Sequence, residues 1–553
     1  MGDGLFSKFK EYSVAEFFKK NRQMLGFSGK VRSLTTIVHE YVTNSLDACS
    51  EAGTYPEIEV WVSGEGEDKY RVRTRDNGPG IPKTHIGKAL GMMLAGTKFN
   101  RYMQQRGQQG IGATGCTMYA LITTGKPIKV VSSHEGKRVE CEVSMDFKSN
   151  KPLINVISEG LGEEGKSGLE IEGIFGDVKH EKSAYGVYEY LRRTAIANPH
   201  ATIIFNSPDG ERFVFPKSVD EIPAKPVEVK PHPLGIGAHD LIEKARSAPY
   251  QKISSFLQEE FTRVTLNKIK ELQEAVPEVD LGKKPSAMSW EDAEKLVAGF
   301  RKIKWIAPAT DSVVPIGTKQ VTSSLSSVIS PEFMQVTERS PKIYRGGIPF
   351  VVEVGLAYNG KGANGEILRF ANRAPLLFDA GGCAITQTIK SVDWKRYGIK
   401  NLDEEPLSIF VHFASVHVPY TSAGKQSISD EEEVVDEIKN AVMEAARGLD
   451  RHLSGKRKAK EMVSKRTAIL RYVEQLSRDL AELGGKKAES EKLKERLLKL
   501  VEGKYSAGKI EEAEAAAEAL EPANGGAEGK TDGEAAEKKA GQKTLKDEEG
   551  GEE

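Results

Sequence analysis

The chain has 553 residues and a mass of 60.6 kDa, and at roughly 150 residues per domain this length predicts three or four domains. Its 79 basic and 80 acidic residues give a formal net charge of −1, so any contact with nucleic acid must come from local patches. No apolar run approaches the ~20 residues that span a bilayer, and the composition excludes membrane, collagenous and secreted disulfide-rich proteins.

Cysteine and histidine usage argues against disulfide and metal sites. Cys49, Cys116, Cys141 and Cys383 lie far apart and form no Cys-x-x-Cys pair, so we expect buried, reduced thiols in a cytoplasmic protein. The ten histidines lack the spacing of zinc ligands, so a zinc site is not expected.

The first third of the chain has the mixed pattern of an α/β domain. Large apolar side chains at helix-like spacing over residues 5–18 predict either a docking arm or a first core helix, and residues 33–49 are predicted to form a helix. Alternating apolar residues at 58–62 and 70–72 predict strands, and mixed elements continue to about Phe215.

Prolines between residues 216 and 233 mark a domain boundary. Residues 234–300 then have a helical pattern, with apolar side chains at helical spacing. A second mixed region follows, and its clearest strand-like runs are residues 350–354 and 409–413.

The C-terminal region is predicted to be helical and then unstructured. Apolar spacing indicates a long helix from near Asp430, followed by another amphipathic helical stretch from about Met462 to Val501. After Tyr505 the chain consists mainly of Ala, Glu, Gly and Lys. Because such a composition buries too little surface to offset the entropy of ordering, we expect a disordered tail.

The first motif with chemical potential lies on the predicted helix. Glu40, Asn44 and Asp47 stand at i, i+4 and i+7, and at about 100° per residue they fall within about 60° of one another. Apolar residues flank this polar stripe, so it faces either the edge of a pocket or water. Taken alone, the pattern favours an ordinary solvated helix face.

The second motif is the turn sequence Asp76-Asn77-Gly78-Pro79-Gly80. The carboxylate of Asp76 could accept a hydrogen bond from an exocyclic amine, and glycines such as Gly80 would let the backbone approach a flat ring closely. Alone, the same letters predict no more than a turn.

The third motif is the glycine-rich segment Arg106-Gly107-Gln108-Gln109-Gly110-Ile111-Gly112-Ala113. Its glycines permit backbone N–H groups to converge on an anion, especially where a helix begins directly afterwards. The order of the glycines is not the dinucleotide-binding Gly-x-Gly-x-x-Gly, and no Walker-type Gly-Lys-Ser/Thr occurs. A flexible linker is therefore the alternative interpretation of this segment alone.

Together, the three motifs follow one another within about 75 residues and resemble the Bergerat-fold ATPases. This superfamily includes gyrase-type topoisomerases, the ninety-kilodalton heat-shock chaperones, MutL proteins and sensor histidine kinases. The resemblance narrows to the B subunits of type IIB DNA topoisomerases (topoisomerase VI), found mainly in archaea, and covers about residues 1–470. It is carried by Asn44-Ser45-Leu46-Asp47-Ala48, Gly107 to Gly112, Pro231-His232-Pro233, Arg369-Phe370-Ala371-Asn372-Arg373 and Gly424-Lys425.

The resemblance implies an α+β multidomain fold. Its parts are a Bergerat-fold ATPase α/β sandwich, a helical helix-two-turns-helix insert, and a ribosomal-S5-like α/β transducer domain with a long C-terminal helix. The implied bounds are 1–229 for the ATPase domain with its N-terminal arm, 230–306 for the insert, 307–470 for the transducer, 471–505 for a helical extension and 506–553 for a disordered tail.

The resemblance also implies roles for individual residues. Glu40 would activate the attacking water, Asn44 would ligate Mg²⁺, and Asp76 would read the adenine amino group of ATP. Lys425 would act catalytically as a switch that reaches the γ-phosphate from the second domain, although its surroundings alone favour one more exposed lysine. The remaining members of the implied nucleotide-binding set are Gly80, Thr97, Lys98, Arg106, Gly107, Gln108, Gln109, Gly110, Ile111, Gly112 and Ala113.

Three other stretches leave alternatives open. Ser167-Gly168-Leu169 stands where many superfamily members carry Gly-Thr, so either Ser167 substitutes for the threonine or the correspondence shifts by one residue. Trp394-Lys395-Arg396-Tyr397 interleaves aromatics with cations and predicts either a DNA contact or a half-buried surface element. A basic cluster at residues 456–466 favours a solvated helix face over a DNA or partner contact.

The implied function is that of the ATP-binding and hydrolysing subunit of a type IIB topoisomerase. Two copies would bind ATP and dimerise around double-stranded DNA, while an A subunit in an A2B2 heterotetramer performs the cleavage. A sensor kinase is disfavoured because the only histidine just upstream, His39, lies inside the Asn44 helix. The alternative is an ATP-dependent dimerising clamp, MutL-like or chaperone-like, without strand passage. We expect a cytoplasmic, nucleoid-associated protein with no membrane partner.

Overall fold

The computed structural model describes residues 12–96, 102–107, 110–310, 312–360, 364–422, 424–485, 487–505 and 508. Outside the described residues lie Met1 to Glu11 of the predicted arm, Thr97, Lys98, Gln108, Gln109 and nearly all of the predicted tail. The chain separates into two compact units, Met1–Lys460 and Glu461–Glu553, which are described one at a time.

The N-terminal part of the first unit is built on an eight-stranded sheet, in the order β5-β4-β3-β6-β2-β1-β7-β8. Its strands are β1 (Glu57–Gly66), β2 (Lys69–Asp76), β3 (Ile128–His134), β4 (Lys137–Asp146), β5 (Lys151–Leu161), β6 (Gly168–Phe175), β7 (Thr202–Asn206) and β8 (Arg212–Phe215). Neighbouring strands are antiparallel except β1 and β7, which run parallel.

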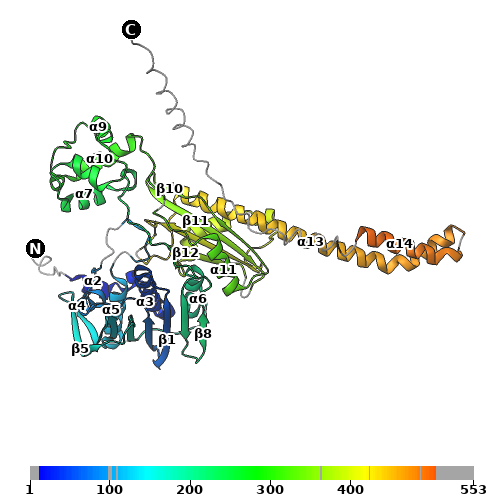
Figure 1. Ribbon diagram of the computed structural model, residues 1–553, viewed down its shortest axis with the longest axis horizontal. Coiled ribbons are helices and arrows are strands. Elements are labelled where there is room, and N and C mark those ends of the chain that lie inside the picture. Colours follow the sequence, from blue (N-terminus) through cyan, green and yellow to red (C-terminus); the bar gives the residue numbers. More distant parts are fainter. Residues whose placement is uncertain are drawn as a thin grey trace, which may run out of the picture. The chain divides into compact units, whose positions relative to one another are not determined.

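Helices pack against one face of this sheet (Figure 1). They are α3 (Lys30–Ala52), α4 (Lys83–Gly91), α5 (Gly112–Thr124) and α6 (Val187–Ala197), and α2 (Val14–Lys20) packs against α5. Inward residues alternate with more exposed ones along β1, as expected of a strand with one covered face, and Ile58 and Val60 share a core with Leu34 and Val38 of α3. The predicted helix at 33–49, the strands beside it and the α/β sandwich are confirmed.

A helical module follows the prolines, as predicted. It contains α7 (Ala238–Ser247), α8 (Ile253–Glu260), α9 (Leu266–Ala275) and α10 (Trp290–Lys302). Ser289 caps α10 in a capping box with Asp292, which satisfies two N–H groups at the start of the helix. Phe256, Phe261 and Phe300 belong to a core of this module's own residues.

The second mixed region is a sheet in the order β10-β11-β14-β12-β13, with β9 paired to β11. Its elements are α11 (Thr318–Ile329), β9 (Phe333–Glu338), β10 (Lys342–Tyr344), β11 (Ile348–Tyr358), β12 (Glu366–Ala371), β13 (Ala374–Pro375), α12 (Ala384–Ser391) and β14 (Leu407–Ser415). β11 and β14 are buried along nearly their whole length. The reason is that residues of α11 pack with Phe410 of β14 on one side, whereas Val351 and Val411 join a separate core with Ile438 on the other.

The long C-terminal helix differs from the prediction. α13 runs without interruption from Glu432 to Leu483, so the stretch predicted to begin near Met462 is not a separate helix. No proline occurs between these bounds, and an isolated glycine is insufficient to end a helix. The break comes at Gly484-Gly485, where Gly485 has a φ of +69°, and α14 (Ser490–Lys504) follows. The domain bounds themselves stay predictions.

Two expectations from composition can be compared with the structure. All four cysteines are buried and free, as predicted. Among the described residues, no helix has the length and apolar character needed to cross a membrane.

Candidate nucleotide-binding site

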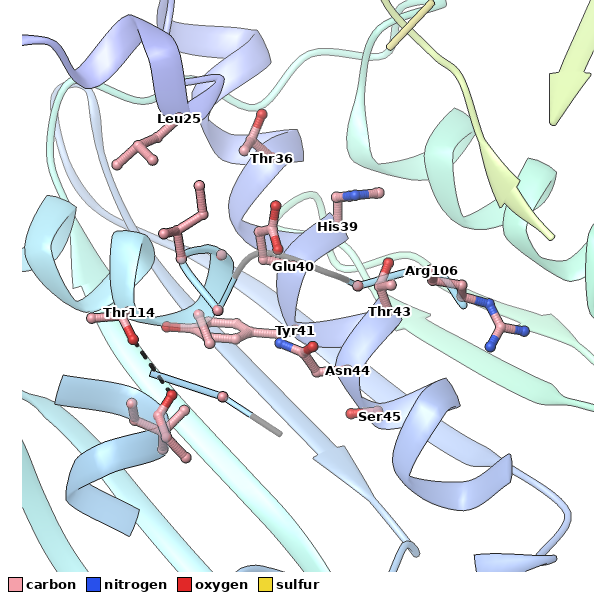
Figure 2. A pocket seen from close by; sticks show the side chains of 18 of the residues that line it. Leu25, Thr36, His39, Glu40, Tyr41, Thr43, Asn44, Ser45, Arg106 and Thr114 are labelled. Carbon is pink, nitrogen blue, oxygen red and sulfur yellow. Dashed lines mark hydrogen bonds between the residues drawn. The ribbon is translucent and has the colours of Figure 1, made fainter. Parts of the chain in front are cut away.

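A cavity of about 340 Å³ opens beside α3, within the usual size range of small-molecule sites (Figure 2). Its walls come from α3, the β2–α4 turn, the described residues of the glycine-rich segment and the loop before α13. The predicted site residues that line it are Glu40, Asn44, Asp76, Gly80, Arg106, Gly107, Gly110, Ile111, Gly112, Ala113 and Lys425. The predicted Thr97, Lys98, Gln108 and Gln109 lie outside the described residues.

The α3 wall presents a carboxylate and a carboxamide on successive turns, Glu40 and Asn44 (Figure 2). Asn44 is exposed, whereas Tyr41, Val42 and Ser45 around it are buried, so its amide is open to the cavity. These two residues of the predicted polar stripe therefore face a pocket rather than bulk water.

Glu40 is seated against the N-terminus of α5. A Cβ at Gly112, the first residue of that helix, would lie 1.7 Å from Glu40 Oε2, so any side chain there would displace the carboxylate. The N-terminal end of a helix carries a partial positive charge and free N–H groups. The carboxylate and the anion-favouring helix end therefore face the same small volume.

Asp76 is buried beside the cavity, with only 7% of its surface exposed. Its Oδ2 accepts a hydrogen bond from Ser45 Oγ at 2.6 Å, and its Oδ1 accepts from the backbone N–H groups of Gly78 at 2.9 Å and Leu169 at 3.2 Å. Burial raises the pKa of Asp76, and these three hydrogen bonds oppose the rise. The carboxylate is therefore held in one orientation.

Gly168, in the stretch where many superfamily members carry Gly-Thr, lies against the backbone of Asp76. Gly168 has a φ of +153°, and a Cβ there would lie 2.2 Å from the carbonyl oxygen of Asp76. This close approach lets the N–H of Leu169 donate a hydrogen bond to the Asp76 carboxylate. The hydroxyl group that donates to the same carboxylate belongs to Ser45. Ser45 and Leu169 were not predicted, and the only sequence signal for Ser45 was its place beside Asn44 in the helix motif.

Asp47 does not face this cavity, contrary to the simple stripe. Its buried carboxylate accepts from Arg106 Nη1 at 2.7 Å and lines a neighbouring cavity of about 210 Å³. Seven residues span about 10 Å along a helix, which takes Asp47 beyond the stretch occupied by Glu40. Asp47 thus holds Arg106 rather than a ligand.

Lys425 reaches the cavity from the second mixed region. Its Nζ donates a hydrogen bond to the carbonyl oxygen of Arg106 at 3.1 Å, and its backbone has a φ of +52° in a turn closed by Ser422. Burial lowers the pKa of His39, which lines the same cavity. The negative charge of Glu40 opposes this shift, and the positive charge of Lys425 adds to it. The exposed-lysine interpretation is wrong for this residue.

The aromatic and basic motif near residue 394 lies elsewhere. Trp394 is only 6% exposed, belongs to the core beneath α13, and donates from Nε1 to the carbonyl of Ile389 at 2.9 Å. It cannot stack on DNA in this conformation, which favours the half-buried interpretation; Lys395 and Arg396 are exposed. In the basic cluster, Lys456 is paired with Glu332.

Comparison with known proteins identifies the fold family. Residues 308–465 match the family model "Topoisomerase VI B subunit, transducer", and residues 29–148 match "Histidine kinase-, DNA gyrase B-, and HSP90-like ATPase". The B subunit of type 2 DNA topoisomerase 6 from Pyrococcus horikoshii is 44% identical over 554 residues, covering 92% of this chain and 98% of the relative. The chain belongs to the topoisomerase VI B subunit family.

A second topoisomerase VI B subunit, from Methanothermobacter thermautotrophicus, is 47% identical over 476 residues, covering 84% of this chain and 90% of that one. A solved structure of the 43K ATPase domain of Thermus thermophilus gyrase B gives a TM-score of 0.37 at 15% identity, covering 90% of this chain and 97% of that one. As a topoisomerase VI B subunit, the chain is an ATP-dependent subunit of a type II DNA topoisomerase, and the clamp alternative is not supported.

Proposed function

We propose that the cavity beside α3 binds ATP with Mg²⁺ and that Glu40 activates the water that attacks the γ-phosphate. The observation that carries this proposal is the seating of Glu40 against the N-terminus of α5, with Asn44 one turn away. A helix N-terminus favours phosphate oxygens, and a carboxylate beside them can take a proton from water.

Asp76 is proposed to accept a hydrogen bond from the adenine amino group. Ser45, Gly78 and Leu169 fix its orientation, so the lone pairs they leave free point in a defined direction. The turn after Asp76 packs closely, because Gly80 has a φ of +71° and a Cβ there would meet the Ser133 carbonyl oxygen at 2.2 Å. Gly107, Gly110 and the N-terminus of α5 are proposed to contact the phosphates.

The residues present fit a magnesium ion held mainly by nucleotide. Among the described residues no group of three His, Cys, Asp or Glu side chains could hold a metal. Mg²⁺ bound to nucleotides characteristically takes one or two protein ligands with phosphate oxygens and water, and the exposed Asn44 amide oxygen supplies such a ligand. When bound, the ion would neutralise phosphate charge.

Lys425 is proposed to exchange the Arg106 carbonyl for the γ-phosphate. The carbonyl bond shows that the side chain already reaches the cavity. A cation on a flexible stem can distinguish a terminal phosphate from its absence. ATP binding would then drive two B subunits to dimerise around DNA. Hydrolysis would release Lys425 and open this dimer, which acts as a gate for DNA.

The assembly proposed is an A2B2 heterotetramer in the cytoplasm, associated with the nucleoid. The A subunit would cleave double-stranded DNA, and the ATP gate of the B subunits would control relaxation and decatenation. The test is relaxation of supercoiled plasmid by the chain mixed with its candidate A subunit, with and without ATP. Relaxation that requires both components is expected, and relaxation independent of ATP would contradict the proposal.

A further inference from the structure

Three consecutive residues that lead into the glycine-rich segment, Gln104 to Arg106, are bonded to the second mixed region. We call these three residues the lid root, because they precede the residues proposed to contact the phosphates. The Gln104 side chain pairs with the Val314 main chain, donating from Nε2 to its carbonyl at 2.9 Å and accepting from its N–H at Oε1 at 2.6 Å. Asn372 Nδ2 donates to the Gln105 carbonyl at 3.1 Å, and Lys425 donates to the Arg106 carbonyl. Lys425 therefore contributes one of these four bonds.

The Arg106 side chain connects the lid root to the same region by a second route. Beyond its ion pair with Asp47, Arg106 Nη2 donates to Asn198 Oδ1 at 2.6 Å. Asn198 in turn donates from Nδ2 to the Arg373 carbonyl at 3.0 Å. The Gln105 carbonyl and the Arg106 side chain are thus both connected to the Asn372-Arg373 turn.

That turn is anchored in the buried sheet. Asn372 and Arg373 form the two-residue connection between β12 and β13, with φ values of +47° and +65°, a left-handed conformation that asparagine tolerates better than arginine. Arg373 N–H donates to His412 Nε2 at 2.9 Å, and His412 Nδ1 lies 2.6 Å from Glu353 Oε2. A displacement of the turn must therefore act on the sheet interior.

We propose that Gln104 and Asn372 are positioning residues that couple the nucleotide-binding segment to the transducer sheet. Their exposed fractions are 5% and 2%, and both line the smaller cavity rather than the nucleotide cavity, so they act without touching nucleotide. When Lys425 leaves the Arg106 carbonyl, the three bonds of Gln104 and Asn372 keep the lid root joined to the sheet. A shift of Gln104–Arg106 on nucleotide binding is then passed to the sheet through these bonds, and this inference rests on the proposed function.

The test uses Gln104→Leu and Asn372→Gly in the full chain assembled with the A subunit. Leucine keeps the volume of Gln104 without its polar atoms, and glycine keeps the left-handed turn without the amide. Gln387→Leu is the matched control, because that exposed glutamine also bonds a backbone carbonyl, of Gly381. The measured quantities are the Kd for a non-hydrolysable ATP analogue, ATP turnover, and supercoils removed per ATP.

We expect both variants to keep the Kd and turnover within about threefold while supercoils removed per ATP fall about tenfold, with the control unchanged. Wild-type coupling in both variants would overturn this inference alone. A parallel fall in nucleotide affinity would also overturn it, because that result indicates a merely structural role. Absence of nucleotide binding by the wild type would overturn the proposed function and this inference together.

Discussion

The two sheets of the first unit are covered differently. The N-terminal sheet has helices on one face, and its edge strand β5 is exposed along almost its whole length. The central strands of the second sheet, β11 and β14, are buried on both faces. One sheet therefore leaves room beside its helices for a ligand, and the other is a sealed core.

Polar groups follow the same division. Around the cavity, Glu40 and Asn44 are at least partly open to solvent and available to a ligand. In the second sheet, Glu353 is fully buried and accepts from Ile316 N–H, Gly317 N–H and the His412 ring. Satisfied buried networks are rigid, which suits a region that transmits movement, whereas open polar groups suit one that performs chemistry.

The largest effect on stability is expected from a substitution inside the buried core of the second sheet. Glu353→Ala leaves its three donors unpaired inside the core and should lower the free energy of unfolding by about 3–5 kcal/mol. Urea unfolding followed by tryptophan fluorescence measures this, because Trp394 lies in the same sheet's core. Exposed Glu404→Ala is the control, expected within about 0.5 kcal/mol; equal effects would contradict a sealed network.

At the nucleotide cavity, Gly112→Ala should lower the rate of ATP turnover rather than the stability of the protein. The added methyl group would displace the Glu40 carboxylate from the start of α5, and ATP turnover should fall about a hundredfold. Gly115→Ala, in the same helix, is the control, because its nearest neighbour would lie at an ordinary 3.4 Å. Steady-state ATPase assays compare the two, and equal rates would separate Gly112 from catalysis.

Asp76→Asn tests whether Asp76 binds the adenine base of ATP. The change removes the charge from a buried acceptor and places an amide donor opposite either Ser45 or the ligand, so ATP affinity should fall about thirtyfold. Calorimetric titration measures the Kd, with exposed Asp209→Asn as the control. An unchanged Kd would remove Asp76 from the adenine site.

The smallest predicted effect is on pH dependence. Burial lowers the pKa of His200 to about 3, with Arg373 and Arg106 adding to the shift. Because the unfolded histidine has a pKa near 6.5, the unfolded state binds more protons below that value, and stability is lost as pH falls. Between pH 7.5 and 5.5 the wild type should lose about 1.4 kcal/mol more than His200→Gln, measured by urea unfolding; parallel losses would contradict this.

Local patterns predicted those parts whose cause is local. The helix of Glu40 and Asn44, the strands beside it and the turn at Asp76 follow from periodicity and turn chemistry. The roles implied by resemblance placed Lys425 at the cavity, which its neighbours in sequence did not indicate.

Partners distant in sequence were not predictable from the same patterns. Asn372 meets Gln105 across 267 residues, and Gln104 meets Val314 across 210, so only the folded chain reveals these bonds. Trp394 was ambiguous because its neighbouring cations are exposed while the indole is buried, and a tetrapeptide pattern does not distinguish the two.

The most direct test of the central claim is to measure ATP binding and ATP turnover side by side in Glu40→Gln. The amide keeps the size of the side chain but cannot take a proton from water. The Kd for ATP should stay within about threefold of the wild type while turnover falls by roughly a hundredfold or more. Undiminished turnover would contradict the account.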